Sequence, residues 1–162
     1  KGFGLLLKAL EVVYAKHPQL QCLVFGGGQG EEMDSKVPPM RFMGFVESGL
    51  LQRIIYSASD VFVIPSQQEA FGQTALEAMA CGTAVVGFDT GGIPDMIKPG
   101  KTGLLAENGN YEALANAIDT LLSENARRDV MAAAARGFAV ENFNKQRQGK
   151  LYFELYKKAL GQ

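Results

Sequence analysis

Two glutamates and a glycine in the middle of the chain have the types and spacing of an anion-binding site. Glu69 precedes Gly72, and Glu77 follows inside an otherwise almost wholly apolar stretch from Gln73 to Cys81. The stretch predicts a helix, whose N-terminus would offer free backbone N–H groups and the positive end of its dipole. A lone carboxylate on such a helix is costly to bury unless something binds it. These residues therefore predict a site for an anionic ligand such as a phosphate.

Each glutamate taken alone has a simpler explanation. Glu69 is then an acid near a helix N-terminus, a position worth about 0.3–1 kcal/mol. Glu77 is then a solvated helix residue. The pair is more specific than either member, because both glutamates flank Phe71-Gly72 and follow Pro65-Ser66.

Short apolar strands alternate with helices over the first two thirds of the chain. The predicted strands are 20–25, 40–43, 61–64, 84–88 and 102–106. The predicted helices are 2–16, 50–57, 73–81, 111–122, 126–140 and 145–160, with a short turn or helix up to 97. This alternation is typical of a parallel sheet covered on both faces. We predict an α/β fold with a doubly wound parallel sheet of about six strands.

Glycine or proline follows nearly every predicted strand, at 26–28, 44–46, 65–69 and 89–92. Ligands of doubly wound sheets bind at the carboxyl ends of the strands, so we expect these segments to line one cleft. The glycines at 26–28 do not fit a dinucleotide fingerprint, because the third glycine would fall on Glu31. A tight turn and a close backbone approach to a ligand both remain open for them.

The length and composition fit a single domain. The 162 residues suffice for a single core, and the formal net charge of −1 gives no general attraction to nucleic acid or anionic membrane. The sequence contains no run of about 20 apolar residues, so it predicts no transmembrane helix. Cys22 and Cys81 lie far apart in apolar segments, which favours a reducing compartment over a disulfide framework or a metal site. The chain opens at Lys1 inside an amphipathic pattern, so we interpret it as a fragment.

The run of motifs resembles a known family. Residues 65–86 read P-S-Q-Q-E-A-F-G-Q-T-A-L-E-A-M-A-C-G-T-A-V-V, which is similar to the signature of retaining glycosyltransferases of the GT-B fold, family four type (glycosyl transferases group 1). Lys-Gly at 1–2, R-F-M-G-F-V at 41–46 and T-G-L-L at 102–105 match further segments, and G-G-I-P-D at 91–95 does so with Asp in place of Glu. Ala84 stands where proline is common. The resemblance covers essentially the whole chain and implies a Rossmann-like, C-terminal, donor-binding half of a GT-B enzyme.

The resemblance implies a role for each matching residue. Glu69 would be the catalytic-site acid that holds the transferred sugar near its anomeric carbon, and Glu77 would accept hydrogen bonds from the ribose. The remaining donor-binding residues would be Lys1 at the diphosphate, Phe71, Gly72 and Gln73 through backbone N–H groups at the distal phosphate, and Phe45 and Val46 at the nucleobase. Gly26 and Gly28 are added to the candidate donor site from their place after a strand, not from the resemblance.

The resemblance also implies partners. The donor would be a nucleoside diphosphate sugar, used without metal or other cofactor, and the acceptor domain would be the N-terminal part of the same polypeptide. Such an enzyme would act in the cytoplasm, in polysaccharide or glycolipid synthesis, with any membrane contact made through the missing half. The fragment alone would be inactive, and helix 145–160 would cross to the missing domain. A nucleotide-sugar epimerase half and a non-catalytic nucleotide-sugar-binding subunit remain alternatives.

Overall fold

A computed structural model describes residues 2–26 and 35–161 of the chain. The strands are β1 (Cys22–Val24), β2 (Met40–Phe42), β3 (Val61–Ile64), β4 (Ala84–Phe88) and β5 (Gly103–Ala106). The helices are α1 (Phe3–Tyr14), α2 (Gly49–Ala58), α3 (Gln73–Ala80), α4 (Ile93–Met96), α5 (Tyr111–Ser123), α6 (Asn125–Asn142) and α7 (Lys145–Ala159). Every predicted strand and helix is present, with ends that differ by a few residues.

The strands form two parallel sheets. β1 pairs with β2, and β4 lies between β3 and β5. The parallel, doubly wound α/β character is confirmed. The count of about six strands in one sheet is wrong for the described residues, which hold five strands in sheets of two and three, because β1 and β3 are not hydrogen-bonded to each other.

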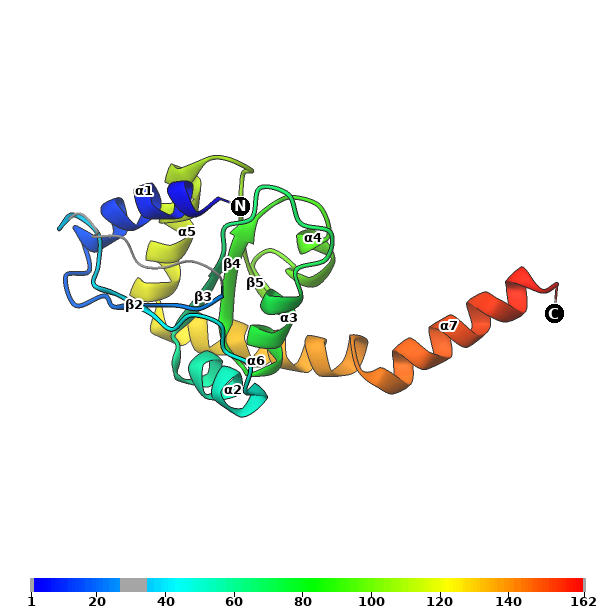
Figure 1. Cartoon of the computed structure of the whole chain (residues 1–162). Helices are drawn as coiled ribbons and strands as arrows, with labels where there is room; N and C mark the ends of the chain where they lie inside the picture. Colours follow the sequence, from blue (N-terminus) through cyan, green and yellow to red (C-terminus); the bar gives the residue numbers. More distant parts are fainter. Residues whose placement is uncertain (1, 27–34, 162) are drawn as a thin grey trace.

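The central strand β4 explains why the three-stranded sheet is stable. All five of its residues are buried, as expected for a continuously apolar strand in a parallel sheet. Ala84, Val86 and Phe88 pack with residues of α1 and α5, whereas Val85 packs on the opposite side with residues of α2, α3 and α6. One helical layer therefore covers each face (Figure 1).

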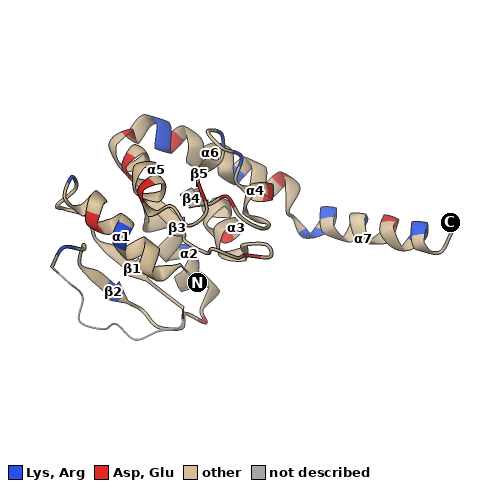
Figure 2. Cartoon of the chain, turned by 90° about the horizontal axis from the view of Figure 1, so that it is seen from above, with Lys and Arg blue, Asp and Glu red and all other residues tan. Residues whose placement is uncertain are grey.

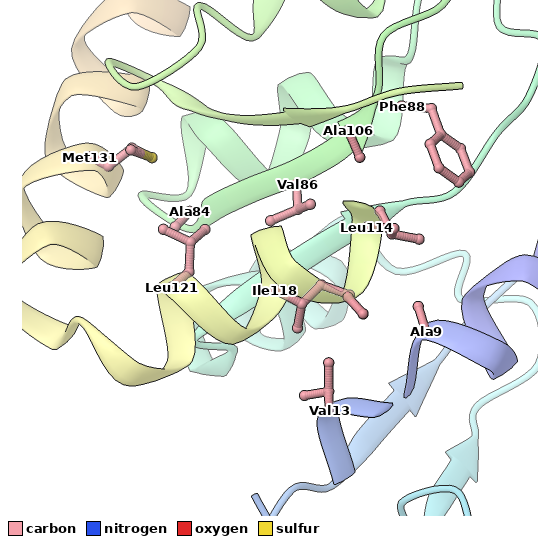
Figure 3. Packing of buried hydrophobic residues seen from close by; sticks show 11 residues of the cluster. Ala9, Val13, Ala84, Val86, Phe88, Ala106, Leu114, Ile118, Leu121 and Met131 are labelled. Carbon is pink, nitrogen blue, oxygen red and sulfur yellow. The ribbon is translucent and has the colours of Figure 1, made fainter. Parts of the chain in front are cut away.

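The layer formed by α1 and α5 has both an apolar and a charged contact. Figure 3 shows the β4 side chains facing α5, with α1 packed beyond it, through the labelled residues Leu114, Ile118, Leu121, Ala9 and Val13. At the end of α1, Lys16 Nζ lies 2.6 Å and His17 Nε2 lies 2.8 Å from the carboxylate oxygens of Asp119 on α5. The hydrogen bond from Lys16, followed by that from His17, lowers the pKa of Asp119 from its ordinary value.

Helix α7 differs from the other helices. None of its residues is buried, and Figure 1 shows it projecting away from the body of the molecule. Charged residues of both signs are spread over the helices and loops, α7 included (Figure 2). Within the described ranges, no helix is both long and apolar enough to cross a bilayer.

Candidate functional site

Glu77 is held in place by a tyrosine from another helix. The hydroxyl of Tyr56, on α2, donates a hydrogen bond of 3.0 Å to Oε2 of Glu77, on α3. Tyr56 is 2% exposed, and its burial, followed by the negative charge of Glu77, raises the pKa of the phenol above its ordinary value. The hydroxyl therefore stays protonated and donates. Because a carboxylate can accept several hydrogen bonds, Oε1 of Glu77 is left for another donor.

Helix α2 ties this carboxylate to the loop that follows β2. Gln52 Nε2 donates to the carbonyl oxygen of Val46 at 2.7 Å. Gln52 and Tyr56 are four residues apart, so they lie on the same face of α2, one turn from each other. The Val46 backbone and the Glu77 carboxylate are thus fixed by adjacent turns of one helix.

The end of β1 joins the same cluster through aromatic contacts. The ring of Phe25 lies 5.3 Å from the ring of Tyr56, in an edge-on arrangement, and the ring of Phe62 on β3 lies 5.4 Å away. Gly26 follows Phe25 and donates its N–H to the carbonyl of Gly44 at 2.9 Å. The exits of β1 and β2 are therefore bonded to each other beside Tyr56.

The N-terminus of α3 is open. Gly72 caps the helix with φ of 90°, and no side chain caps the first turn, which leaves the N–H groups of Gln73 and Thr74 without a capping acceptor. A Cβ on Gly72 would meet only the terminal methyl group of Met96, at 2.8 Å, so it is the backbone angle that calls for glycine here. The arrangement leaves backbone donors at the positive end of the helix dipole.

Glu69 is fixed through its backbone by the loop after β4. Its carbonyl accepts a hydrogen bond of 3.0 Å from the N–H of Gly92, and a Cβ on Gly91 would lie 1.8 Å from the same oxygen. Its side chain is half-buried and makes a long contact of 3.5 Å from Oε1 to the N–H of Phe71. The carboxylate is therefore positioned by a rigid loop rather than by a strong side-chain bond.

Three further contacts gather neighbouring loops at this edge. The carbonyl of Gln67 accepts hydrogen bonds from Thr90 Oγ1 at 3.1 Å and from Asn108 Nδ2 at 3.2 Å. A Cβ on Gly2 would lie 1.7 Å from the carbonyl oxygen of Pro65, so the start of α1 lies directly against the end of β3. The carboxyl ends of β3, β4 and β5 and the N-terminus of α1 thus meet.

The structure brings most of the predicted site residues into this region. Glu69, Gly72, Gln73 and Glu77 lie on the loop and first turns of α3, and Val46 is tied to them through α2. Gly26 is placed beside them by Phe25, and Phe45 is 82% exposed next to Val46. Lys1 and Gly28 lie outside the described residues. The roles of all these residues stay predictions.

Phe71 differs in one respect from its neighbours. Its ring packs edge-on against Phe143 at 5.8 Å, at the junction of α6 and α7. The side chain therefore ties the loop to the junction of α6 and α7.

The sequence did not identify Tyr56, Gln52 or Asn108. The spacing of Gln52 and Tyr56, which puts two polar groups on one face of a short helix, was the available signal. Within the described ranges, no group of three His, Cys, Asp or Glu residues could hold a metal ion.

Comparison with known proteins decides the family. The sequence pattern of the family described as glycosyl transferases group 1 matches residues 1–138. The chain belongs to this family. It is 34% identical, over an alignment of 172 positions, to a D-inositol 3-phosphate glycosyltransferase of Rhodococcus opacus, with 98% of this chain and 38% of that protein covered. The chain therefore spans about two fifths of the length of this glycosyltransferase.

Solved structures agree with this assignment. A C-terminal domain of a glycosyl transferase group 1 family protein from Francisella tularensis has a TM-score of 0.78 and 25% identity, and covers 90% of this chain and 80% of that one. The Anabaena protein HepE, solved in complex with UDP-glucose, has a TM-score of 0.77 and 25% identity, over 94% of this chain and 45% of that one. The prediction of a C-terminal domain of a GT-B glycosyltransferase is confirmed, and these names give no support to the epimerase alternative.

Proposed function

We propose that this domain binds the nucleoside diphosphate sugar donor of a retaining glycosyltransferase. The observation that carries the proposal is the pairing of an open α3 N-terminus with a carboxylate held four residues further along the same helix. Glu77 lies about 6 Å of helix rise beyond Gln73. One ligand that carries both a diphosphate and a ribose can therefore engage the helix end and Glu77 together.

The nucleotide would be held by three parts of the site. The N–H groups of Gly72, Gln73 and Thr74 would bind the distal phosphate, with Lys1 as a further cation, so that charge is neutralised without a metal. Oε1 of Glu77 would accept from the ribose hydroxyls, while Tyr56 holds Oε2. The base would lie against the backbone at 45–46, which Gln52 fixes.

Glu69 would act on the sugar. In transfer, the bond between the anomeric carbon and the diphosphate oxygen breaks, and the leaving diphosphate keeps the electron pair. A bond to the acceptor hydroxyl oxygen forms, and the proton of that hydroxyl passes to the leaving diphosphate oxygen. Glu69 would hold sugar hydroxyls so that the anomeric carbon faces the acceptor, with retained configuration. The acceptor would be bound by an N-terminal domain of the same polypeptide, so the domain alone would bind donor without efficient transfer.

The wider setting follows from the same proposal. A donor of this class is a cytoplasmic metabolite, so the enzyme would work in the cytoplasm or at the inner face of a membrane, in the synthesis of a polysaccharide or glycolipid. The HepE structure with UDP-glucose makes uridine diphosphate the first nucleotide to test.

Calorimetric titration with uridine, guanosine and adenosine diphosphates, with and without a chelator, tests the binding proposal. We expect one of the three to bind weakly and equally well with the chelator. Loss of binding with the chelator would refute metal-independent binding, and no binding of any diphosphate would refute the site.

Two substitutions separate the proposed roles of the glutamates. Glu77→Ala removes a charge-assisted hydrogen bond worth about 1.5–3 kcal/mol, so the Kd for the diphosphate should rise roughly 10- to 150-fold. Glu69→Ala should leave that Kd unchanged and lower transfer by the polypeptide that includes the acceptor domain. Glu11→Ala, at an exposed position of α1, is the matched control. Unchanged binding by Glu77→Ala would show that the ribose assignment is wrong.

A further inference from the structure

The charge of the chain is divided unevenly between α7 and the rest. Residues 143–162 hold five Lys or Arg residues and one acid, Glu154, which gives a net charge of +4. The whole chain carries −1, so residues 1–142 carry −5. Figure 2 shows that most charged residues of α7 are basic, on the part of the chain that projects from the body. A basic segment joined to an acidic body indicates a negatively charged partner for that segment.

The side chains of α7 are sorted by kind around the helix axis. At about 100° per residue, all apolar side chains of residues 150–160 fall within an arc of about 200°, and all charged ones fall outside it. The apolar arc holds Leu151, Tyr152, Phe153, Leu155, Tyr156, Ala159 and Leu160, and the charged face holds Lys150, Glu154, Lys157 and Lys158. The large apolar side chains are 55–73% exposed. The end of α7 is therefore an amphipathic helix with both of its faces in solvent.

The combination of the two faces favours a bilayer surface as the partner. A helix that lies in the interface of a bilayer places its Leu and aromatic side chains below the headgroups and keeps a Lys-rich face at their level. A nucleic acid would contact the basic face alone and leave the apolar arc in water. Anionic headgroups above an apolar layer satisfy both faces of α7 at once.

The lysines are placed at the borders of the apolar arc. Lys157 and Lys158 border it on opposite sides, and Nζ of Lys157 lies 4.8 Å from the centre of the Phe153 ring, one turn back. Long side chains in such positions keep their stems along the apolar layer and carry their ammonium groups to the headgroups. Tyr152 and Tyr156 stack with ring centroids 6.5 Å apart, and each joins an apolar ring to a hydroxyl that suits the wet boundary of a bilayer.

We propose that α7 docks this protein on an anionic lipid bilayer, where it lies in the plane of the surface with the arc of residues 151–160 below the headgroups. The acidic body is repelled by such a surface, so α7 is the part of the chain that approaches it. Figure 1 shows that α7 projects far enough for a flat surface to reach it. The proposal goes beyond the donor site and does not depend on it. The family resemblance would instead place α7 against the missing domain, and the experiments below separate the two.

Sedimentation of the whole chain with lipid vesicles tests the partner. One set of vesicles is phosphatidylcholine alone, and the other contains about 30% phosphatidylglycerol, an anionic lipid. We expect binding to the anionic vesicles to be at least tenfold tighter, and to weaken severalfold in about 0.5 M salt, which shortens the Debye length. Equal binding to both kinds of vesicle, or binding to neither, would overturn the proposal.

Charge reversal within α7 tests the basic face. Lys157→Glu combined with Lys158→Glu should weaken binding to anionic vesicles at least tenfold. Lys101→Glu combined with Arg127→Glu is the matched control, because it makes the same change of net charge at exposed positions outside α7. The control should lose less than twofold. Equal losses in the two double variants would overturn a role for α7.

Polar substitutions test the apolar arc in the same way. Leu151→Ser combined with Leu155→Ser should weaken binding at least tenfold, whereas Val130→Ser combined with Val140→Ser on α6, where both valines are more than half exposed, should lose less than twofold. Because all four side chains are exposed, the Tm of the body should stay unchanged and shows that each variant is folded. Unchanged vesicle binding by the leucine variant would overturn the proposal.

The orientation of the helix can be read from a single tryptophan, since the chain contains none. Phe153→Trp places the reporter in the apolar arc, and Glu154→Trp places it on the charged face. Anionic vesicles should shift the emission of the first variant to shorter wavelength and leave that of the second nearly unchanged. The same shift in both variants, or in neither, would overturn the orientation in the plane of the bilayer.

Two other partners for the apolar arc are outcomes of the same experiments. A dimer in the absence of vesicles that is abolished by the double leucine substitution would assign the arc to a second copy of the chain. In the polypeptide that includes the acceptor domain, vesicle binding unaffected by the α7 substitutions would assign the arc to that domain. Either result would overturn the proposal.

Discussion

At the scale of single residues, Tyr56 has the largest influence on the candidate site. Its ring touches the end of β1 and the side of β3, its hydroxyl binds Glu77, and its carbonyl accepts a hydrogen bond of 2.6 Å from the buried Thr83. Tyr56 does not itself need to touch a nucleotide. It is a positioning residue for the carboxylate that we propose binds the ribose.

Tyr56→Phe therefore tests positioning apart from contact. The ring and its packing remain, but Glu77 loses its donor, so we expect the Kd for the nucleotide to rise about three- to tenfold, a change of roughly 1 kcal/mol. Since the effect passes through Glu77, the double variant with Glu77→Ala should bind no more weakly than Glu77→Ala alone. Calorimetry of the wild type, the two single variants and the double variant measures the four binding free energies. Losses of binding free energy that add in the double variant would contradict a positioning role for Tyr56.

Substitution of Gly91 tests whether the loop after β4 holds the backbone of Glu69 in place. The φ of Gly91 is 53°, and a Cβ there would lie 1.8 Å from the Glu69 carbonyl. Gly100 is the matched control, because its φ is 75° but a Cβ there would meet nothing within 4 Å. Each Gly→Ala change costs about 1–2 kcal/mol for the backbone conformation. In urea unfolding, we expect Gly91→Ala to lower the free energy of unfolding clearly more than Gly100→Ala does, and to weaken nucleotide binding. Equal losses of stability in the two variants would contradict the contact between Gly91 and the Glu69 backbone.

The sequence revealed the two glutamates of the candidate site but not the residues that hold them in position. Glu69 and Glu77 could be recognised because a carboxylate before a helix and another within an apolar helix are unusual in themselves. Tyr56 lies 21 residues from Glu77 along the chain. Nothing in a local pattern pairs the two, because their contact depends on how α2 packs against α3.

At the scale of elements, the contact between α1 and α5 links a charged group to stability. Asp119 has a lowered pKa in the folded protein, so its contribution to stability is fully present above its ordinary value of 3.8 and is lost as the pH falls below that value. Lys16 and His17 supply the partners.

Asp119→Asn should lower the free energy of unfolding at pH 7 by on the order of 1 kcal/mol or less, since Lys16 is largely exposed. The difference from wild type should shrink as the pH is lowered below about 4, because the wild-type carboxylate then also becomes neutral. Urea unfolding between pH 3 and pH 7 measures it. Asp129→Asn, at a residue whose side chain is 76% exposed, should show little difference at any pH. A difference for Asp119→Asn that is as large at pH 3 as at pH 7 would contradict this account.

The pattern of apolar residues predicted the individual strands and helices better than it predicted how the strands pair into sheets. The five apolar runs became five strands, because each run is long and uniform enough to define a buried parallel strand. Their division into two sheets could not be predicted, since an apolar run carries no information about which neighbour it will pair with.

At the scale of the whole molecule, α7 is attached to the body mainly by its first residues. Its start adjoins Phe143, which packs on Phe71 and on Phe138, and the rest projects without a buried residue. Leu151, Tyr152, Phe153, Leu155 and Tyr156 are each more than half exposed. A lone helix of this length is marginal in water, and a patch of this kind often marks an interaction site.

We therefore expect α7 to exchange its amide hydrogens much faster than β4 and α3 in the isolated chain. Deletion of residues 145–162 should change the Tm by no more than about 2 °C, because little apolar area is buried there. Hydrogen exchange, read with the mass in solution, tests both statements. Strong protection of α7 in a strict monomer would show that it belongs to this domain's own core, whereas protection in a dimer would show that a second copy covers it.

The close approach of the loops at Gly2, Gly91 and Gly92 bears on how the choice of donor that we propose for this domain can be altered. At each of these positions a single added methyl group would overlap a neighbouring main-chain oxygen. A library built for new sugar specificity should therefore keep these three positions constant. Diversity belongs at Phe45, Gln73 and Asp95, whose side chains are exposed around the same edge, where variation alters the shape and charge offered to a donor while the loops keep their course.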